Sequence, residues 1–191
     1  MFRLSKFLTV FCVVVLTLAL LAGCGGKSDT NEIKIGTIGP LTGDVATYGI
    51  STKNGVEIAV DQFNENGGID GKKVVLISED TRGDQTEAAN AASKLIERDK
   101  VVAIVGGVIS AETMTAGPIA NDAGVVMISS SSTAAGIPEI GDYIFRNCLS
   151  DEVQAVQLAE YAASELGLKR FAIMFTNNDY GLSLKNAFEA K

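Results

Sequence analysis

Small hydroxyl side chains follow glycines and apolar segments of this chain at points where a small anion could bind. Ser110 comes just after Gly106-Gly107 and opens a predicted helix, and the run from Ser129 to Thr133 follows the next apolar segment. A helix N-terminus attracts anions through its free N–H groups and dipole, and a hydroxyl can donate a further hydrogen bond. The pattern therefore indicates binding of a small carboxylate. Two structural alternatives stay open: Ser110 as a helix N-cap, and the serine run as a hydrogen-bonded turn.

Two tyrosines stand in similar positions. Tyr48 follows the first apolar segment and its loop Gly39-Pro40-Leu41-Thr42-Gly43, and Tyr180 follows the segment 171–175. Open α/β sheets bind ligands beyond the carboxyl ends of their strands, so side chains after several strands converge on one edge. Tyr48 and Tyr180 are therefore candidate walls of a binding pocket, with surface or core packing as the alternative.

The composition argues against catalysis and against metal sites. The chain has no His, which removes Ser-His-Asp and Cys-His catalysis and histidine metal ligands. No phosphate-binding glycine motif follows a strand. Asp44, Glu79, Asp80 and Asp84 lie near strand ends, where acids can transfer protons, but we interpret them as loop and cap residues. We expect no enzyme, no cofactor and no metal.

The first 23 residues have the features of an export signal. Arg3 and Lys6 precede an apolar run, Phe7 to Leu21, that is shorter than the roughly 20 residues of a membrane span. Leu21-Ala22-Gly23-Cys24 resembles a bacterial lipobox, which implies cleavage before Cys24 and anchoring by acyl chains on Cys24. A membrane helix and an ordinary signal peptide are the alternatives. Residues 24–31 are interpreted as a flexible polar tether.

Charge and cysteine content fit an exported, soluble body. The net charge of −7 becomes more negative without residues 1–23, which carry two basic and no acidic residues, and this argues against nucleic-acid binding. Of the 3 Cys, Cys12 lies in the predicted signal and Cys24 is the predicted lipidation site, so Cys148 has no intramolecular partner. We expect Cys148 to pack as a small apolar residue, with a reactive thiol as the alternative.

Strand-like and helix-like segments alternate along the body of the chain. Apolar runs predict strands at 33–39, 73–78, 101–105 and 125–128. Helical periodicity predicts helices near 50–66, 85–99 and 111–123. Pro118 is expected to kink the last helix or to mark its start. Continuous apolar strands are typical of a parallel sheet buried on both faces, so the order predicts an α/β fold, a doubly wound parallel lobe.

After Ser129 the pattern changes and then restarts. A short strand at 143–146 leads to a helix at 151–166, a strand at 171–175 and a helix from Gly181. One strand and less than two helices cannot bury a core of their own. We therefore divide the chain into a signal (1–23), a tether (24–31), an N-terminal α/β lobe (32–146), and a hinge crossing with the truncated start of a second lobe (147–191).

The loops described above carry a family resemblance, together with the turn Asn66-Gly67-Gly68-Ile69-Asp70-Gly71-Lys72-Lys73 and the segment Glu79-Asp80-Thr81. From about residue 32 onward, the sequence resembles the leucine/isoleucine/valine-binding proteins, which have the type I periplasmic binding fold of ABC importers. The resemblance implies two lobes that close on a ligand by a hinge. The segment near 146–150 resembles the first crossing between the lobes.

The resemblance also implies roles for individual residues. Ser110 and Thr133 hold the ligand carboxylate with the help of backbone groups near Ser131, and Tyr48 and Tyr180 wall the pocket for the ligand side chain. In this family, the acidic partner of the ligand amino group comes from a later part of the second lobe. The sequence therefore leaves open which solute is bound.

These observations lead to one expected function. We expect a monomeric, exported lipoprotein, anchored on the outer side of the cell membrane or in the periplasm, that captures a branched-chain or related amino acid for an ABC permease. A ligand-sensing domain of the same fold, working in regulation or chemotaxis, is the alternative, and the lipobox counts against it. An exported enzyme is disfavoured by the absence of His.

Overall fold

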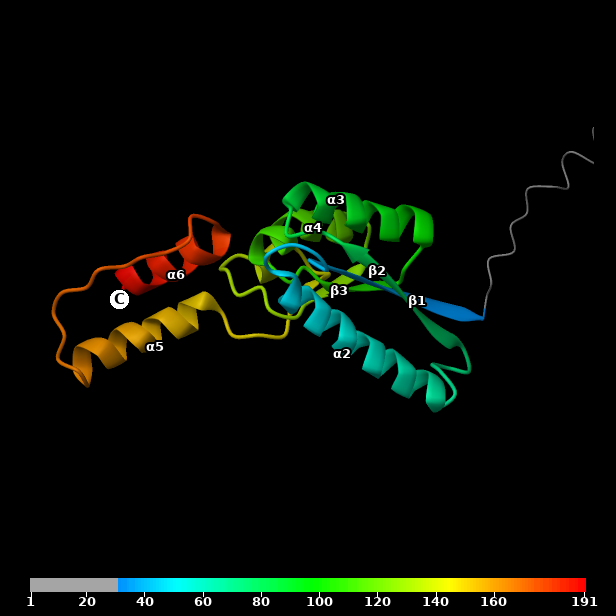
Figure 1. Cartoon of the computed structure of the whole chain (residues 1–191), viewed down its shortest axis with the longest axis horizontal. Coiled ribbons are helices and arrows are strands. Elements are labelled where there is room, and N and C mark those ends of the chain that lie inside the picture. Colours follow the sequence, from blue (N-terminus) through cyan, green and yellow to red (C-terminus); the bar gives the residue numbers. More distant parts are fainter. Residues whose placement is uncertain (1–30) are drawn as a thin grey trace, which may run out of the picture. The chain divides into compact units, whose positions relative to one another are not determined.

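The chain folds around one parallel sheet. The computed structural model describes residues 31–191, so the predicted signal, Cys24 and nearly all of the tether lie outside the described residues. Five parallel strands pair in the order β2-β1-β3-β4-β5. They are β1 (Glu32–Gly39), β2 (Lys73–Asp80), β3 (Ala103–Gly106), β4 (Val126–Ser129) and β5 (Ile144–Arg146). The strand order runs outward in both directions from β1 and β3, which confirms the predicted doubly wound α/β lobe (Figure 1).

Within residues 31–191, five α-helices and two shorter helical segments connect and follow the strands. They are α2 (Ala46–Glu65), α3 (Gln85–Ser93) with its π-helical extension η1 (Lys94–Asp99), α4 (Ser110–Asp122), the 3-10 turn η2 (Pro138–Ile140), α5 (Asp151–Ser164) and α6 (Asp179–Glu189). At three helix starts, a polar side chain accepts a hydrogen bond from a backbone N–H group of the first turn. These residues are Asp84 at α3, Ser150 at α5 and Asn178 at α6. Such N-caps determine where these helices begin. The interpretation of Asp84 as a cap is confirmed.

The core lies between the sheet and the pair α3 and α4. Ile104, Met127 and Ile144 project from β3, β4 and β5 into a cluster with residues such as Leu95 and Ala116 of the helical layer. The helix α2 packs on the opposite face, against β1 and β2 (Figure 1). The apolar runs predicted burial on both faces of the sheet. This prediction is wrong for β4, where Val126 is 38% exposed, because α2 does not extend over it. Phe145 of the next strand, β5, is 49% exposed for the same reason.

One further expectation is wrong, and one of two open alternatives is excluded. Residues 171–175 form no strand, because all described strands belong to the sheet of the N-terminal lobe and none pairs with this segment. The segment instead lies in the connection between α5 and α6, and the Phe171 ring meets the Phe188 ring of α6 edge-on at 5.3 Å. Pro118 lies inside α4 and does not mark its start.

Within residues 31–191, no helix combines the length and the apolar character that crossing a bilayer requires.

Candidate functional site

The loops after β1 and β3 meet where the strand order reverses. A methyl group placed on Gly39 would lie 2.7 Å from Val108 Cγ2, so the loop after β1 touches the loop after β3. A methyl group on Gly49 would lie 2.0 Å from the Pro40 carbonyl oxygen, so the first turn of α2 is pressed onto the same loop. In doubly wound sheets, ligands bind in the crevice at this point.

Hydroxyl groups hold the loop after β4 against the loop after β3. The carbonyl oxygen of Gly107 is approached by Thr113 Oγ1 at 2.7 Å, Ser129 Oγ at 2.5 Å and Ser132 Oγ at 2.6 Å. Gly107 has a φ of +66°, and a methyl group there would stand 2.2 Å from Thr113 Oγ1. Only glycine allows this close approach without strain.

Two more serines of the same run bond within the protein. Ser131 Oγ donates to the Val108 carbonyl at 2.7 Å, and Ser130 Oγ shares a hydrogen bond of 3.0 Å with Thr52 Oγ1 of α2. The interpretation of the serine run as a hydrogen-bonded turn is therefore confirmed for residues 129–132. Ser131 is exposed, and its hydroxyl is already used, which leaves its backbone groups as the part that fits the predicted role.

Thr133 differs from the serines that precede it. Its Oγ1 is buried and has no hydrogen-bond partner within residues 31–191. Its carbonyl oxygen accepts from Asp151 N at 2.8 Å and from Arg146 Nη1 at 3.0 Å, which fixes the backbone around it. Thr133 thus offers a preoriented hydroxyl group at the strand ends.

Ser110 is bonded to the residue after Thr133 and is not a helix cap. It is 3% exposed and is the first residue of α4, whose N-cap position is occupied by Ile109. Ser110 Oγ accepts from Ala134 N at 3.3 Å, which joins it to the residue that follows Thr133. The structure therefore brings Ser110, Ser131 and Thr133 together at the edge of the crevice.

The two predicted tyrosines are at the surface. Tyr48 is 64% exposed on the first turn of α2, one turn before Thr52, which contacts the serine loop. Tyr180 is 44% exposed on the first turn of α6, and Ser183 of the same helix accepts from Ala135 N at 2.9 Å. Both tyrosines thus stand on helices that touch the loop after β4. Their role as pocket walls stays a prediction.

Asp151 is a candidate that the sequence analysis did not single out. It is 0% exposed, and neither carboxylate oxygen has a hydrogen-bond partner among the described residues. Its position at the start of α5 gives it some stabilisation from the helix dipole, but buried carboxylates normally need a partner. Its backbone N–H bonds to the Thr133 carbonyl at 2.8 Å, so the backbone of Asp151 lies next to that of Thr133. In the sequence, Ser150-Asp151-Glu152 shows only the acidic first turn of a helix.

Asp80 ties the loop after β1 to the end of β2. Its carboxylate accepts from Leu41 N at 2.8 Å, Arg82 N at 2.9 Å and Thr42 Oγ1 at 2.6 Å. Burial acts to raise the pKa of Asp80, but the hydrogen bonds outweigh it and the pKa lies below its ordinary value. Its interpretation as a loop residue is wrong, as it is for Glu79, because both residues belong to β2 and pair with β1.

We expect Asp80→Asn to lower the free energy of unfolding at neutral pH by about 1 kcal/mol, because charge-assisted hydrogen bonds to the loop are weakened and solvent screening keeps the effect small. A depressed pKa stabilises the fold above the ordinary value of 3.8, and this stabilisation is lost as the pH falls through the lower pKa of the folded state. Urea unfolding over a pH series measures the difference in the free energy of unfolding between variant and unmodified protein. Asp44→Asn, in the exposed loop after β1, is the control. A difference between variant and unmodified protein that stays constant into acid contradicts the prediction.

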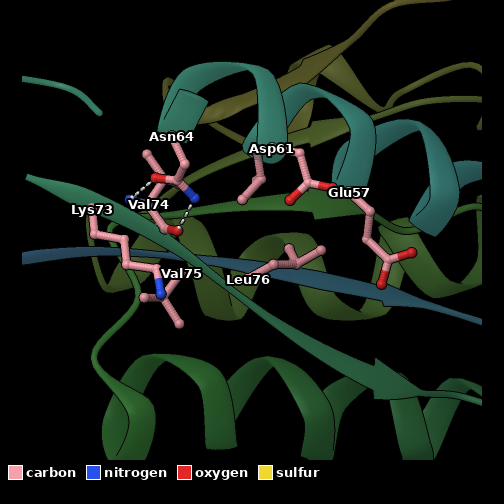
Figure 2. A pocket seen from close by; sticks show the side chains of 8 residues that line it. Glu57, Asp61, Asn64, Lys73, Val74, Val75 and Leu76 are labelled. Carbon is pink, nitrogen blue, oxygen red and sulfur yellow. Dashed lines mark hydrogen bonds between the residues drawn. The ribbon is translucent and has the colours of Figure 1, made fainter. Parts of the chain in front are cut away.

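Figure 2 shows a groove that lies away from this site, between α2 and β2. Its volume is about 380 Å³, and its lining includes Glu57, Asp61 and Lys73. Asn64 bonds both backbone groups of Val74 at 2.8 Å, so the groove sits at the amino end of β2 (Figure 2). The predicted ligand residues follow the carboxyl ends of the strands, and none of them lines this groove.

Cys148 makes a structural contact near the site. It is half-buried, its Sγ donates to the Ser132 carbonyl at 3.4 Å, and burial raises the pKa of its thiol. A raised pKa lowers the thiolate fraction and with it the reactivity. Over residues 31–191, no three His, Cys, Asp or Glu side chains are grouped so that they could hold a metal ion.

Comparisons with known proteins agree on one family. The family described as periplasmic binding protein matches residues 32–191. The Leu/Ile/Val-binding protein BraC3 of Rhizobium johnstonii is 37% identical over 186 residues, which cover 97% of this chain and 48% of BraC3. The chain thus spans about half the length of the curated relatives that it matches.

Solved structures give the same result. The branched-chain amino acid transporter substrate-binding protein LivJ of Streptococcus pneumoniae, in complex with isoleucine, superposes with a TM-score of 0.78 at 33% identity, covering 83% of this chain and 46% of LivJ. A solute-binding protein of Rhodopseudomonas palustris in complex with 3,4-dihydroxybenzoic acid has a TM-score of 0.75 at 26% identity, with 84% and 44% covered. These similar proteins are solute-binding proteins and not enzymes. The present chain belongs to the periplasmic binding protein family and has its type I α/β fold.

Proposed function

We propose that this chain is the ligand-binding N-terminal part of an exported solute-binding protein that captures an amino acid, branched-chain or related, for an ABC importer. The observation that carries the proposal is the buried, unpaired hydroxyl of Thr133 next to Ser110 at the crevice of the sheet. The names of the similar proteins support an amino-acid ligand, since BraC3 is a Leu/Ile/Val-binding protein and LivJ was solved with isoleucine.

The geometry suits the two charges of an amino acid. The hydroxyls of Ser110 and Thr133 and the N-terminus of α4 offer donors to a carboxylate. The carboxylate of Asp151, whose backbone N–H bonds to the Thr133 carbonyl, offers a negative charge to the ammonium group in addition to the acidic partner that the family resemblance implies from the second lobe. Tyr48 and Tyr180 then border the ligand side chain when the second lobe closes over the site. Closure is favoured only to the extent that the ligand makes contacts specific to the closed state.

Export and anchoring are a further part of the proposal. The basic start, the apolar run to Leu21 and Cys24 at the lipobox position support cleavage and acylation. The anchored protein stands on the outer side of the membrane, where a monomer delivers its ligand to the permease. Intact mass of the protein purified from its own cells tests this part, because acylation of Cys24 adds a defined mass.

We expect Ser110→Ala and Thr133→Ala each to weaken amino-acid binding at least tenfold, which is about 1.4 kcal/mol, because each removes one donor to the ligand carboxylate. Titration calorimetry on the protein as its gene encodes it measures the loss. Thr115→Ala is the control, since the Thr115 hydroxyl bonds the Ala111 carbonyl of its own helix at 2.9 Å. Unchanged affinity in both variants contradicts the assigned site.

A further inference from the structure

A second buried carboxylate lies under the N-terminus of α4. Glu112 is 0% exposed, and its Oε1 accepts a hydrogen bond from Thr81 Oγ1, which is also fully buried. Its Oε2 accepts from Ile109 N at 3.3 Å, so it occupies a backbone donor of the turn that positions Ser110. Burial raises the pKa of Glu112, and the charge of Asp80 adds to this, while the hydrogen bonds act against it. The net result is a pKa above the ordinary value, so the side chain carries its charge only where the pH exceeds this raised pKa. In that range Thr81 and Ile109 donate to the ionised carboxylate, in a place where a negative charge is costly.

This charge acts on the same helix end that attracts the ligand. Negative charge near a helix N-terminus offsets the positive end of the dipole, and charges in partly buried sites are weakly screened. A ligand carboxylate placed at Ser110 is therefore repelled by Glu112. A zwitterionic ligand compensates for this repulsion with the attraction of its own ammonium group, whereas a plain carboxylate cannot.

We propose that Glu112 determines specificity by disfavouring plain carboxylates, so that the site selects zwitterionic amino acids. This inference rests on the function proposed above. Selection of this kind is needed, since the fold itself accommodates both ligand classes: LivJ was solved with isoleucine and the Rhodopseudomonas palustris protein with 3,4-dihydroxybenzoic acid. Rejecting a competitor through an uncompensated charge is a general route to specificity.

The test compares leucine with 4-methyl-2-oxopentanoate, which has the same carbon skeleton and carboxylate but a ketone in place of the ammonium group. In Glu112→Gln, measured by calorimetry at mildly alkaline pH on the protein as its gene encodes it, we expect the keto acid to bind about tenfold more tightly. Leucine affinity changes by less than about threefold, because repulsion and attraction are removed together. Glu65→Gln is the matched control: Glu65 is exposed at the end of α2, next to the start of β2.

The outcomes separate the role of Glu112 from simple support of the fold. If Glu112 only supports the fold, its replacement weakens the binding of leucine and of the keto acid in parallel. Structural damage does not strengthen binding of the keto acid. Glu112→Ser, whose short neutral side chain leaves room for water beside Thr81, gives a second measurement of the same ratio. If both variants bind leucine and the ratio of leucine affinity to keto-acid affinity is unchanged, the role of Glu112 is overturned and the proposed function stands. If the unmodified protein binds no amino acid, the proposed function fails, and the inference fails with it.

Discussion

Gly49→Ala is expected to lower the free energy of unfolding by about 3 kcal/mol, which is a large effect for adding one methyl group. The new Cβ would lie 2.0 Å from the Pro40 carbonyl oxygen and 2.9 Å from Pro40 N, and neither backbone atom belongs to a flexible side chain. The first turn of α2 must therefore move away from the loop after β1. The variant should also weaken ligand binding, because Tyr48 and Thr52 move with this turn.

Gly55→Ala is the matched control in the same helix. Apart from its own helix backbone and chain neighbours, no atom lies within 4 Å of a Cβ built at Gly55. Only helix propensity changes, and alanine should stabilise the fold by up to about 1 kcal/mol. Urea unfolding of both variants measures the two values under the same conditions. Equal effects, or a stabilising Gly49→Ala, would show that α2 does not press on Pro40 as described.

Most of the N-terminal lobe could be predicted from the sequence, because its apolar segments have clear periods and its turns carry glycine. The predicted strand at 73–78 corresponds to β2, and the predicted helix at 85–99 corresponds to α3 with η1. The segment 171–175 has the composition of a strand, but a strand also needs a partner, which a local pattern does not contain. The same limit explains Val126, whose apolar run predicted burial without showing which helix would cover it.

The candidate site could be predicted only in part. The position of Ser110, Ser131 and Thr133 follows from the rule that loops after parallel strands share an edge. Which hydroxyl stays free depends on distances between loops: Ser129 and Ser132 reach Gly107, and Thr133 reaches no partner within the described residues. Asp151 was missed because its burial is a tertiary property, and its sequence context is that of an ordinary helix start.

The buried carboxylate of Asp151 reduces the stability of the ligand-free protein and should strengthen binding of a ligand that carries an ammonium group. Its two oxygens are buried without hydrogen bonds to the described residues, and the N-terminal turn of α5 offsets only part of the desolvation. An ammonium group placed near Thr133 would supply the missing partner. Buried groups that cost stability and gain a partner from the ligand are typical of binding sites, where stability is exchanged for function.

We expect Asp151→Asn to weaken binding of an amino acid by about a hundredfold, or roughly 2.7 kcal/mol, since a charge-assisted contact to the ammonium group is lost. The same change should raise the free energy of unfolding of the ligand-free protein by about 1 kcal/mol, because an amide costs less to bury than an unpaired carboxylate. Calorimetry and urea unfolding measure the two effects, with Asp122→Asn at the exposed end of α4 as the control. Because the two effects have opposite signs, general damage to the fold cannot produce them together. A variant that loses both stability and affinity therefore shows that Asp151 supports the structure, and that the ammonium group is held elsewhere.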